Sequence, residues 1–454
     1  MNIKDKEILV IGMARSGIAA AKLAHSKGAK VNVYDAKALK DFNANTQEEV
    51  LKMQNEGIKF YLGEEVDTEN FSLFVVSPGV PLEIELIQKA YQHKKTVIGE
   101  LEFASTYCKA PILAITGTNG KTTTTTLVGE IVKRSNCQTY VVGNIGMAFS
   151  EQVCAIPDHG VAVAEVSSFQ LETICSFHPK ISAILNITPD HLNRHKTMEN
   201  YIDAKCQIFK NQGTDEYVIL NENDTYFESI KQRIQGKIIT FNTEQSVPCG
   251  AYVKNNTIYE NILGIENKVC SVDQLKILGK HNIENVLAAV AITRCFNISL
   301  EIIEKTLEVF RGVEHRIEYV KTIKGVDYFN DSKATNTDSA IKAVLAMKKP
   351  IRLIGGGMDK HCSFVDWIKL FEGKVQKIYI IGETKHQIEK ECHELGYYHT
   401  ELFNSLEDAT QKAYHEAQEG ECVLLSPACA SWDMFESYEQ RGHLFKEIIN
   451  QLRG

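Results

Sequence analysis

The chain contains 454 residues, and at roughly 150 residues per domain this length suggests about three domains. Hydrophobic residues make up 44% and charged residues 24%, the composition of an ordinary globular protein. The formal net charge of -8 argues against a nucleic-acid-binding protein, because such proteins carry clustered basic residues.

The N-terminal sequence MNIKDKEILVIGMARSG leads directly into an apolar strand and a glycine turn. It lacks the basic segment, long apolar stretch and cleavage site of a signal peptide. No apolar run approaches the roughly 20 residues that cross a bilayer, and the twelve cysteines include no C-x-x-C pair. We therefore expect a reduced, cytoplasmic protein that acts as a monomer and has neither a membrane nor a nucleic acid as a partner.

A short β-branched apolar run, a glycine turn and an amphipathic helix follow one another repeatedly, which predicts parallel sheets in doubly wound α/β units. The pattern falls into three blocks with boundaries near residues 107 and 311. The predicted domains are therefore 1–107, 108–311 and 312–454. Within the second block, short strand-like pieces between about 236 and 280 predict an antiparallel extension of the sheet.

The first block opens with a strand, a turn over Gly12 to Gly17, a helix, and a second strand that ends in Asp35. The turn departs from the dinucleotide fingerprint G-x-G-x-x-G, because Ala14 replaces the glycine that lets a pyrophosphate approach the backbone. Asp35 is still suited to bind a ribose hydroxyl. A nucleotide diphosphate site and a purely structural turn both remain open, and SPGV at Ser77 to Val80 adds another loop at a strand end.

The second block contains the strongest motif of the chain, TGTNGKTT at Thr116 to Thr123, between a predicted strand and a predicted helix. In this context backbone N–H groups and a lysine bind phosphates, while a hydroxyl reaches Mg²⁺. Ile115 stands where the general G-x-x-x-x-G-K-[ST] pattern has its first glycine, and Gly117 supplies the turn. The motif predicts ATP as the cofactor.

Two further apolar strands of this block end in polar side chains, within GVAVAEVSSFQLE and ISAILNITPDHLNRH. Ligands bind at the carboxyl ends of parallel strands, so Glu165, Ser167, Asp190 and His191 are predicted beside the phosphate loop. A carboxylate and an imidazole there suit a cation that bridges phosphates. Lys205, in the helical stretch YIDAKCQIF, is by sequence alone a solvent-facing lysine.

The third block begins with VDYFNDSKATNTDSA, which places an acid, a base and three other hydrogen-bonding side chains within six residues. Asp331 or Ser332 is predicted to cap the helix that follows. This assignment leaves Lys333 in the first helical turn, where the helix dipole disfavours a cation. An anionic ligand at the helix start would account for the lysine.

Five segments, GTNGKT, NITPDHLNRH, HNIENVLAA, GVEHRIE and NDSKATN, stand in the order and spacing found in the Mur ligases, and the chain resembles this family over all three blocks. Mur ligases join amino acids to the bacterial cell-wall precursor. The resemblance implies a Rossmann-like N-terminal domain for the UDP-linked substrate, a central P-loop-type domain for ATP, and a Rossmann-like C-terminal domain for the incoming amino acid. DSKATN and SPACASWDMF are similar to the members that add D-glutamate.

The resemblance implies that ATP phosphorylates the terminal carboxylate of UDP-N-acetylmuramoyl-L-alanine, and that the amine of D-glutamate attacks the acyl phosphate. Lys121 would contact the β and γ phosphates, with Thr122 and Glu165 on one Mg²⁺ and His191 on a second. In the family the lysine that matches Lys205 carries a CO₂-derived carbamate, which would make it an oxygen ligand of the second metal ion.

The other site residues are assigned by the same resemblance, and Lys333 is expected near the phosphates or the reacting carboxylate. The expected ATP contacts beyond Lys121 are Gly117, Thr118, Asn119, Gly120, Thr122, Thr123, Asn285, Arg316 and Asp331. The expected uridine contacts are Arg15, Ser16, Asp35 and Lys37, and further contacts of the UDP-linked substrate are Ser77, Gly79, Asn144 and Ser167. The expected D-glutamate contacts are Thr335, Lys360, Ser431 and Tyr438.

Other functions remain open on the sequence. One is another Mur-type or polyglutamate amino-acid ligase, a second is an NAD-dependent oxidoreductase built on the first block, and a third is a P-loop ATPase switch. The oxidoreductase would leave TGTNGKTT unused and would have to tolerate Ala14 in its glycine turn. The switch would leave DSKATN and the third block unused.

Overall fold

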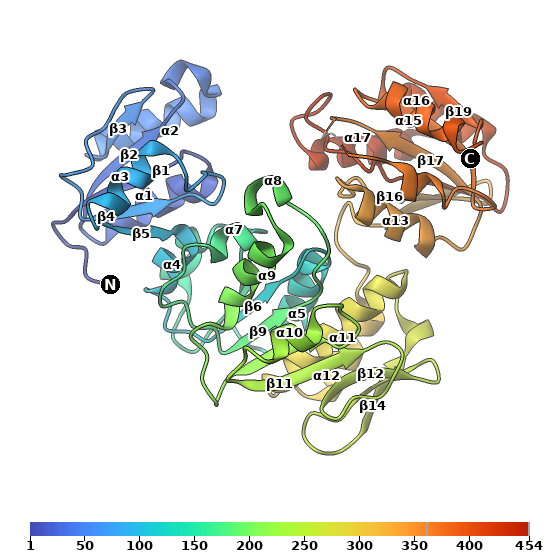
Figure 1. Ribbon diagram of the computed structural model, residues 1–454. Helices are drawn as coiled ribbons and strands as arrows, with labels where there is room; N and C mark the ends of the chain where they lie inside the picture. Colours follow the sequence, from blue (N-terminus) through green and yellow to red (C-terminus); the bar gives the residue numbers. More distant parts are fainter. Residues whose placement is uncertain (360–361, 453–454) are drawn as a thin grey trace. The chain divides into compact units, whose positions relative to one another are not determined.

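The computed structural model describes residues 1–359 and 362–452, which form three mainly parallel sheets flanked by helices (Figure 1). The chain divides into two compact units, the first comprising Met1–Ser271 with Glu284–Thr306 and the second Val272–Ile283 with the chain from Leu307 onward. The first unit holds a five-stranded and a nine-stranded sheet, and the second holds a six-stranded sheet. The predicted α/β class with parallel sheets is confirmed.

The five-stranded sheet has the order β3-β2-β1-β4-β5, and all its strands are parallel. Central strands such as LFVV of β4 are buried throughout, because helices cover both faces of a parallel sheet. The strands are β1 (Glu7–Ile11), β2 (Lys30–Asp35), β3 (Lys59–Leu62), β4 (Leu73–Val76) and β5 (Thr96–Gly99). The helices are α1 (Arg15–Ser26), α2 (Ala44–Asn55), α3 (Glu85–Gln92) and α4 (Glu100–Ser105).

The nine-stranded sheet has the order β14-β13-β12-β11-β10-β9-β6-β8-β7. Its strands are β6 (Ile112–Thr116), β7 (Thr139–Gly143), β8 (Val161–Glu165), β9 (Ile181–Ile184), β10 (Tyr217–Asn221), β11 (Lys237–Asn242), β12 (Gly250–Lys254), β13 (Thr257–Glu260) and β14 (Asn267–Ser271). The pairs β12–β13 and β13–β14 are antiparallel, which confirms the predicted antiparallel extension from residue 250 onward. The prediction is wrong for β11, which is parallel to both β10 and β12.

Eight helices are assigned between residues 108 and 311, and four of them are only four or five residues long. The longest of them, α5 and α11, follow the glycine loop and the extension of the sheet, respectively. The helices are α5 (Lys121–Arg134), α6 (Phe149–Gln152), α7 (Ser168–Leu171), α8 (Leu192–His195), α9 (Met198–Cys206), α10 (Phe227–Lys231), α11 (Lys280–Cys295) and α12 (Leu300–Val309).

The six-stranded sheet of the second unit has the order β15-β16-β20-β17-β18-β19, with only β15 antiparallel to its neighbour. Its strands are β15 (Glu318–Ile323), β16 (Val326–Asn330), β17 (Ile351–Gly356), β18 (Val375–Ile381), β19 (Thr400–Leu402) and β20 (Cys422–Leu425). The helices are α13 (Thr337–Ala346), α14 (Val365–Ile368), α15 (Lys385–Glu394), α16 (Leu406–Glu416) and α17 (Tyr438–Gln451).

The helix after β16 begins later than the sequence predicts. Asn336 is the N-cap of α13, and its side chain accepts a hydrogen bond from the backbone N–H of Ser339. The prediction that Asp331 or Ser332 caps this helix is therefore wrong, and Lys333 lies in the loop before it. The side chain of Asn336 satisfies a helix-end donor that Asp331 was expected to satisfy.

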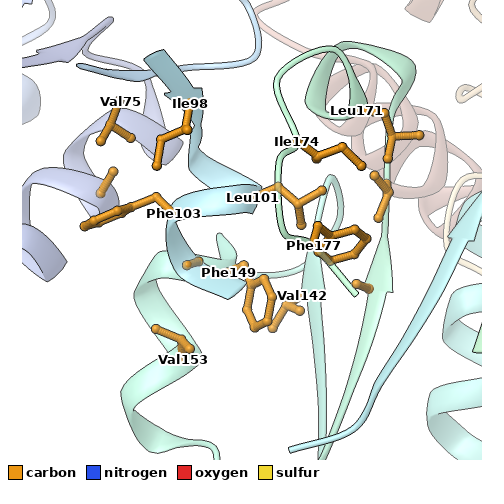
Figure 2. Packing of buried hydrophobic residues seen from close by; sticks show 14 of the residues in the cluster. Val75, Ile98, Leu101, Phe103, Val142, Phe149, Val153, Leu171, Ile174 and Phe177 are labelled. Atoms are coloured by element: carbon orange, nitrogen blue, oxygen red, sulfur yellow. The ribbon is translucent and has the colours of Figure 1, made fainter. Parts of the chain in front are cut away.

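One continuous core joins the first two sheets through the short helix α4. Figure 2 shows Leu101 and Phe103 of α4 among residues of the five-stranded sheet and residues such as Phe149 and Phe177 of the following segment. The buried carboxylate of Glu102 accepts hydrogen bonds from the backbone N–H groups of residues 175–177 at 2.8 to 3.0 Å. Apolar packing and this carboxylate together hold the two sheets in one unit.

All twelve cysteines are free thiols, as the sequence predicts. Cys295 is buried in α11, whereas Cys137 lies in the turn between α5 and β7. Within the described residues, no helix combines the length and the apolar character needed to cross a membrane.

Candidate active site

The glycine loop after β6 is held from one side by the segment that follows the neighbouring strand β9. The backbone N–H groups of Thr118 and Asn119 donate to the main-chain and side-chain oxygens of Asn186 at 2.9 Å, and the Asn186 amide donates to Asn119 O at 3.0 Å. Asn186 was not among the predicted site residues, although it stands in the motif NITPDHLNRH. It fixes the loop that turns toward the start of α5.

Gly120 ends the loop as the N-cap of α5 with a left-handed φ of +87°. A Cβ on Gly120 would lie 2.2 Å from Oδ1 of Asn285, so the predicted ATP residue Asn285 packs directly against the loop. The same Asn285 oxygen accepts a hydrogen bond from Thr124 Oγ1 at 3.3 Å. The loop therefore requires glycine both for its backbone conformation and for this close approach.

Two lysines converge on the loop. The Nζ atoms of Lys121 and Lys205 both lie 2.9 Å from the carbonyl oxygen of Gly117, and Lys121 also donates to Thr118 O. Lys205 is only 1% exposed, and its Nζ lies 4.6 Å from the centre of the Tyr201 ring. The interpretation of Lys205 as a solvent-facing lysine is therefore wrong.

Burial and the nearby Lys121 charge hold the pKa of the Lys205 amine well below its usual value. The physical cause is that a buried ammonium loses the solvation of water and gains a like-charged neighbour. A lowered pKa increases the share of the neutral amine, which is the form that reacts as a nucleophile.

Glu165 ends β8, the strand on the other side of β6, where it lies opposite Ile115. Its side chain is 1% exposed, and Oε1 accepts a hydrogen bond from Asn144 Nδ2 at 2.7 Å. Oε2 is buried and has no hydrogen-bond partner among the residues that the structure describes. Because a buried carboxylate is costly unless it is paired or binds a metal ion, this oxygen fits a cation site. Thr122, also buried, supplies a hydroxyl at the start of α5.

His191 follows β9 in the left-handed conformation, with a φ of +54°, and begins the short helix α8. Its Nε2 lies 3.5 Å from Oδ2 of Asp190, and its ring lies 4.8 Å from that of Phe169. The side chain is 49% exposed, so it is accessible to a ligand at the carboxyl edge of the sheet. Ser167, by contrast, caps α7 through hydrogen bonds with Gln170.

Arg194 and His195 also belong to this region but were not predicted. The Arg194 guanidinium donates to Glu172 at 2.6 Å and to the carbonyl of Pro78 at 3.0 Å. The second bond connects the SPGV loop to helix α8. His195 is buried with Nε2 3.0 Å from Ser168 Oγ, and burial lowers its pKa to about 4. Both residues belong to the same polar segment DHLNRH as Asp190 and His191, and this position could have identified them as candidate site residues.

The predicted uridine residues lie at the carboxyl edge of the five-stranded sheet. The carboxylate of Asp35 accepts hydrogen bonds from the N–H groups of Met13 and Lys37 at 2.8 and 3.0 Å, which closes the turn after β1. The hydroxyl of Ser77 donates to Gly12 O at 3.1 Å. The side chains of Arg15 and Lys37 are exposed, Ser16 is half-buried and Gly79 is exposed. The side chains of Arg15 and Lys37 thus place two positive charges at one edge of the sheet.

In the second unit, Asp331 sits at the carboxyl end of β16, beside β20. Its Oδ2 accepts from Ser426 Oγ at 2.7 Å, and its Oδ1 accepts from the N–H of Ile317 at 3.1 Å. The turn that contains Arg316 is strained, because Ile317 is β-branched and has a φ of +44°. The Asp331 carboxylate thus anchors the turn on which Arg316 stands.

The predicted D-glutamate residues of the second unit lie in the same set of loops. Lys333 Nζ lies 5.3 Å from the centre of the Tyr438 ring at the start of α17. Ser431 is buried in the loop after β20, and Thr335 is half-buried. Lys360 lies outside the described residues.

Burial raises the pKa of Asp331 to about 7, so the stability of the second unit should depend on pH. The unfolded carboxyl loses its proton near the ordinary pKa of 3.8, whereas the native carboxyl keeps it to about 7. The native state binds more protons between these values, so the free energy of unfolding should fall as the pH rises through this window, by about 1.4 kcal/mol per pKa unit. Asp331→Asn should remove this decline.

Both tryptophans, Trp367 and Trp432, belong to the second unit, so their fluorescence during urea denaturation reports the unfolding of that unit. The comparison is between wild type and Asp331→Asn at about pH 5 and about pH 8. An equal loss of stability in the two proteins over this range would contradict the assignment to Asp331.

Three family models match the chain. The model described as the Mur ligase MurD-like N-terminal domain matches residues 6–99, that of the Mur ligase middle domain matches 115–293, and that of the Mur ligase glutamate ligase domain matches 315–429. Curated proteins named UDP-N-acetylmuramoylalanine--D-glutamate ligase from Thermoanaerobacter sp. (strain X514) and Caldicellulosiruptor saccharolyticus are each 45% identical to the chain, and each match covers 100% of both proteins.

Solved structures with similar folds include UDP-N-acetylmuramate-alanine ligase MurC from Thermotoga maritima, with a TM-score of 0.61, 18% identity and coverage of 98% of this chain and 99% of that one. MurF from Acinetobacter baumannii gives a TM-score of 0.63 at 16% identity, with coverage of 97% and 93%. MurF from Thermotoga maritima, solved in complex with ADP, gives 0.59 at 13% identity, with coverage of 99% and 96%. At these identities the similarity concerns the fold.

Proposed function

Because the chain belongs to the Mur ligase family, we propose that it joins D-glutamate to UDP-N-acetylmuramoyl-L-alanine with hydrolysis of ATP to ADP and phosphate. The full-length relatives with 45% identity carry the name of this activity. The product is a precursor of peptidoglycan. We further propose that the protein acts as a cytoplasmic monomer.

The observation that carries this proposal is the arrangement at the end of β6 and β8. A glycine loop with Lys121 precedes α5, and the adjacent strand ends in Glu165, whose buried Oε2 has no donor among the described residues. A lysine, backbone N–H groups and a carboxylate at one sheet edge are the groups that a nucleotide triphosphate with Mg²⁺ requires. The residues present therefore fit both ATP and a hard cation.

A carboxylate is a poor electrophile, so the substrate must be activated before an amine can attack it. We propose that the alanine carboxylate attacks the γ phosphorus, ADP leaves, and the D-glutamate nitrogen then displaces phosphate from the acyl phosphate. Lys121 would neutralise charge on the transferred phosphoryl group, and Lys333 would stabilise the phosphates or the reacting carboxylate. When bound, Mg²⁺ supplies further charge neutralisation at the same oxygens.

We propose that Thr122 and Glu165 hold one Mg²⁺, and that His191 and a carbamate on Lys205 hold a second. The depressed pKa of Lys205 supports this, because the neutral amine forms the N–C bond with CO₂ and releases a proton. The reaction converts a buried cation into an anionic oxygen ligand. The half-exposed His191 lies at the carboxyl edge of the same sheet.

The remaining contacts are proposals of the same kind. ATP would also meet the loop residues Gly117 to Thr123 and Asn285, and Arg316 and Asp331 are proposed as further ATP contacts. The UDP-linked substrate would lie on the loops of the five-stranded sheet and near Asn144 and Ser167. D-Glutamate would bind in the second unit, at Thr335, Lys360, Ser431 and Tyr438. The proposed domains remain 1–107, 108–311 and 312–454, with the boundaries that the sequence pattern predicts.

Release of phosphate from ATP tests the proposal directly. It should require both UDP-N-acetylmuramoyl-L-alanine and an amino acid, and among D-glutamate, L-glutamate, L-alanine, L-lysine and diaminopimelate only D-glutamate should support it. Mass spectrometry of the product would confirm the added residue. Brisk release with neither substrate would favour an ATPase switch, and incorporation of another amino acid would assign the chain to a different Mur-type activity.

A further inference from the structure

We propose that Arg441 positions the amino-acid pocket of the second unit, by joining the loop after β16 to the loop after β20 and by placing a buried positive charge beside them. The inference rests on the proposed function, since it concerns the pocket for the incoming D-glutamate. Arg441 stands on α17 and is not among the residues assigned to any ligand above.

The Arg441 guanidinium makes hydrogen bonds to both loops. Toward the loop after β16, Nε donates to Ser332 Oγ at 2.9 Å and Nη2 donates to Ser332 O at 2.8 Å. Toward the loop after β20, Nη2 donates to Cys429 O at 3.2 Å and Nη1 to Ala430 O at 3.4 Å. The planar fork of arginine suits this task, because its donors point in fixed directions that a lysine cannot reproduce.

The loop after β17 also lies close to the Arg441 guanidinium. A Cβ on Gly357, in the loop after β17, would lie 2.3 Å from Ala430 O and 3.3 Å from Arg441 Nη1. The next residue of α17 is also confined, because a Cβ on Gly442 would lie 2.3 Å from Nδ1 of His315. The three strand-end loops and the start of α17 are thus packed around the guanidinium without room for an added methyl group.

Three described residues proposed to bind D-glutamate or to act on the reacting carboxylate stand close in sequence to these contacts. Lys333 follows Ser332, and Ser431 follows Ala430. Tyr438 lies one helical turn before Arg441, and its carbonyl accepts a hydrogen bond from Ser332 Oγ at 2.8 Å. A displacement of the guanidinium would therefore move all three residues relative to one another.

The charge of Arg441 is the second part of the argument. The side chain is 1% exposed, and the charges of Asp433 and Asp331 act on it, although neither carboxylate is among its hydrogen-bond partners in the described part of the chain. Burial lowers its pKa to about 10, yet it remains protonated at neutral pH. Neutral donors would satisfy the same carbonyls at a lower desolvation cost. A cation in this place complements a ligand that carries two carboxylates.

The test compares Arg441→Lys, which keeps the charge without the fork, with Arg441→Met, which loses both. Steady-state kinetics should show a KM for D-glutamate raised by about tenfold or more in Arg441→Lys, and a kcat lowered by roughly 10²-fold in Arg441→Met. The KM of the UDP-linked substrate should stay within about twofold of wild type in both. Lys412→Met, a partly exposed cation on α16 of the same unit, is the control and should behave as wild type.

A spectroscopic measurement complements the kinetics and uses the two tryptophans. In a Trp367→Phe background the remaining Trp432, which follows Ser431 and is 67% exposed, should report D-glutamate binding as a change in emission. The midpoint of this change should shift to about tenfold higher D-glutamate in Arg441→Lys. This fluorescence titration measures binding and does not depend on turnover.

The proposal would be overturned if both variants had the kcat, the KM for D-glutamate and the titration midpoint of wild type. So would an equal loss of affinity for all substrates together with lower thermal stability, because that pattern indicates a purely structural arginine. If Arg441→Met does not fold, Arg441→Lys carries the test. Failure of the proposed function appears separately, as a wild-type protein that does not incorporate D-glutamate.

Discussion

Replacing Lys205 with alanine is expected to lower the rate of ligation by roughly 10² to 10³-fold while the protein stays folded. The proposed carbamate would be lost, and with it an anionic ligand of the second Mg²⁺. The fold should tolerate the change, because the carbonyl of Gly117 keeps its hydrogen bond from Lys121 and a buried amine is removed. The large effect on rate and the small effect on stability together identify a functional lysine.

The pH dependence of the free energy of unfolding is a second test of the lowered pKa of Lys205. The unfolded lysine stays protonated up to its usual pKa of 10.5, whereas the native amine loses its proton at a much lower pH. Unfolding therefore takes up a proton between these values, and the free energy of unfolding should rise with pH in this window. Lys205→Ala should remove this contribution.

The measurements are the rate of product formation, the thermal midpoint, and nuclear magnetic resonance of protein equilibrated with ¹³C-bicarbonate. Wild type should show a carbamate resonance that is missing in Lys205→Ala. Lys210→Ala, an exposed lysine just after α9, is the matched control and should retain both the resonance and the activity. An active Lys205→Ala variant would refute the proposed role.

Glu165→Gln is expected to reduce activity by roughly 10² to 10³-fold and to abolish the stabilisation of the protein by Mg²⁺ with a nucleotide. The reason is the buried Oε2, which has no donor within the described chain and is paired only when a cation binds. Without Mg²⁺ the variant should be as stable as wild type or more stable, because it no longer buries a charge there.

Glu102→Gln provides the contrast for this experiment. Glu102 is as deeply buried as Glu165, but both its oxygens accept hydrogen bonds from backbone N–H groups. Its substitution should lower the thermal midpoint and leave the shift caused by Mg²⁺ and nucleotide unchanged. Calorimetry with and without Mg²⁺ distinguishes the two patterns. An undiminished Mg²⁺ shift in Glu165→Gln would contradict the metal assignment.

The parts of the site that the sequence predicted are those governed by local rules. The glycine loop, its helix and the strand that ends in Glu165 follow from hydrophobic runs and turn residues, and the structure contains each of them. The antiparallel extension near residue 250 could also be predicted from short alternating strands.

The parts that the sequence did not predict depend on contacts between distant segments. The burial of Lys205 arises because α9 packs against a loop 88 residues away, and no local pattern records this. Arg441 reads as a surface arginine in an amphipathic helix, yet it joins loops that lie up to 109 residues earlier. The start of α13 was misplaced because Asp331 resembles a helix cap but bonds to Ser426 across the sheet.

The shared core around α4 limits how the enzyme can be divided or recombined. A fragment that ends at residue 107 would carry the apolar side chains of Leu101 and Phe103 without the residues that cover them, and Glu102 without its donors. The N-terminal domain is therefore not an independent module for exchange between Mur ligases. A chimera that preserves the fold would have to inherit α4 together with residues 148–177 from the same parent.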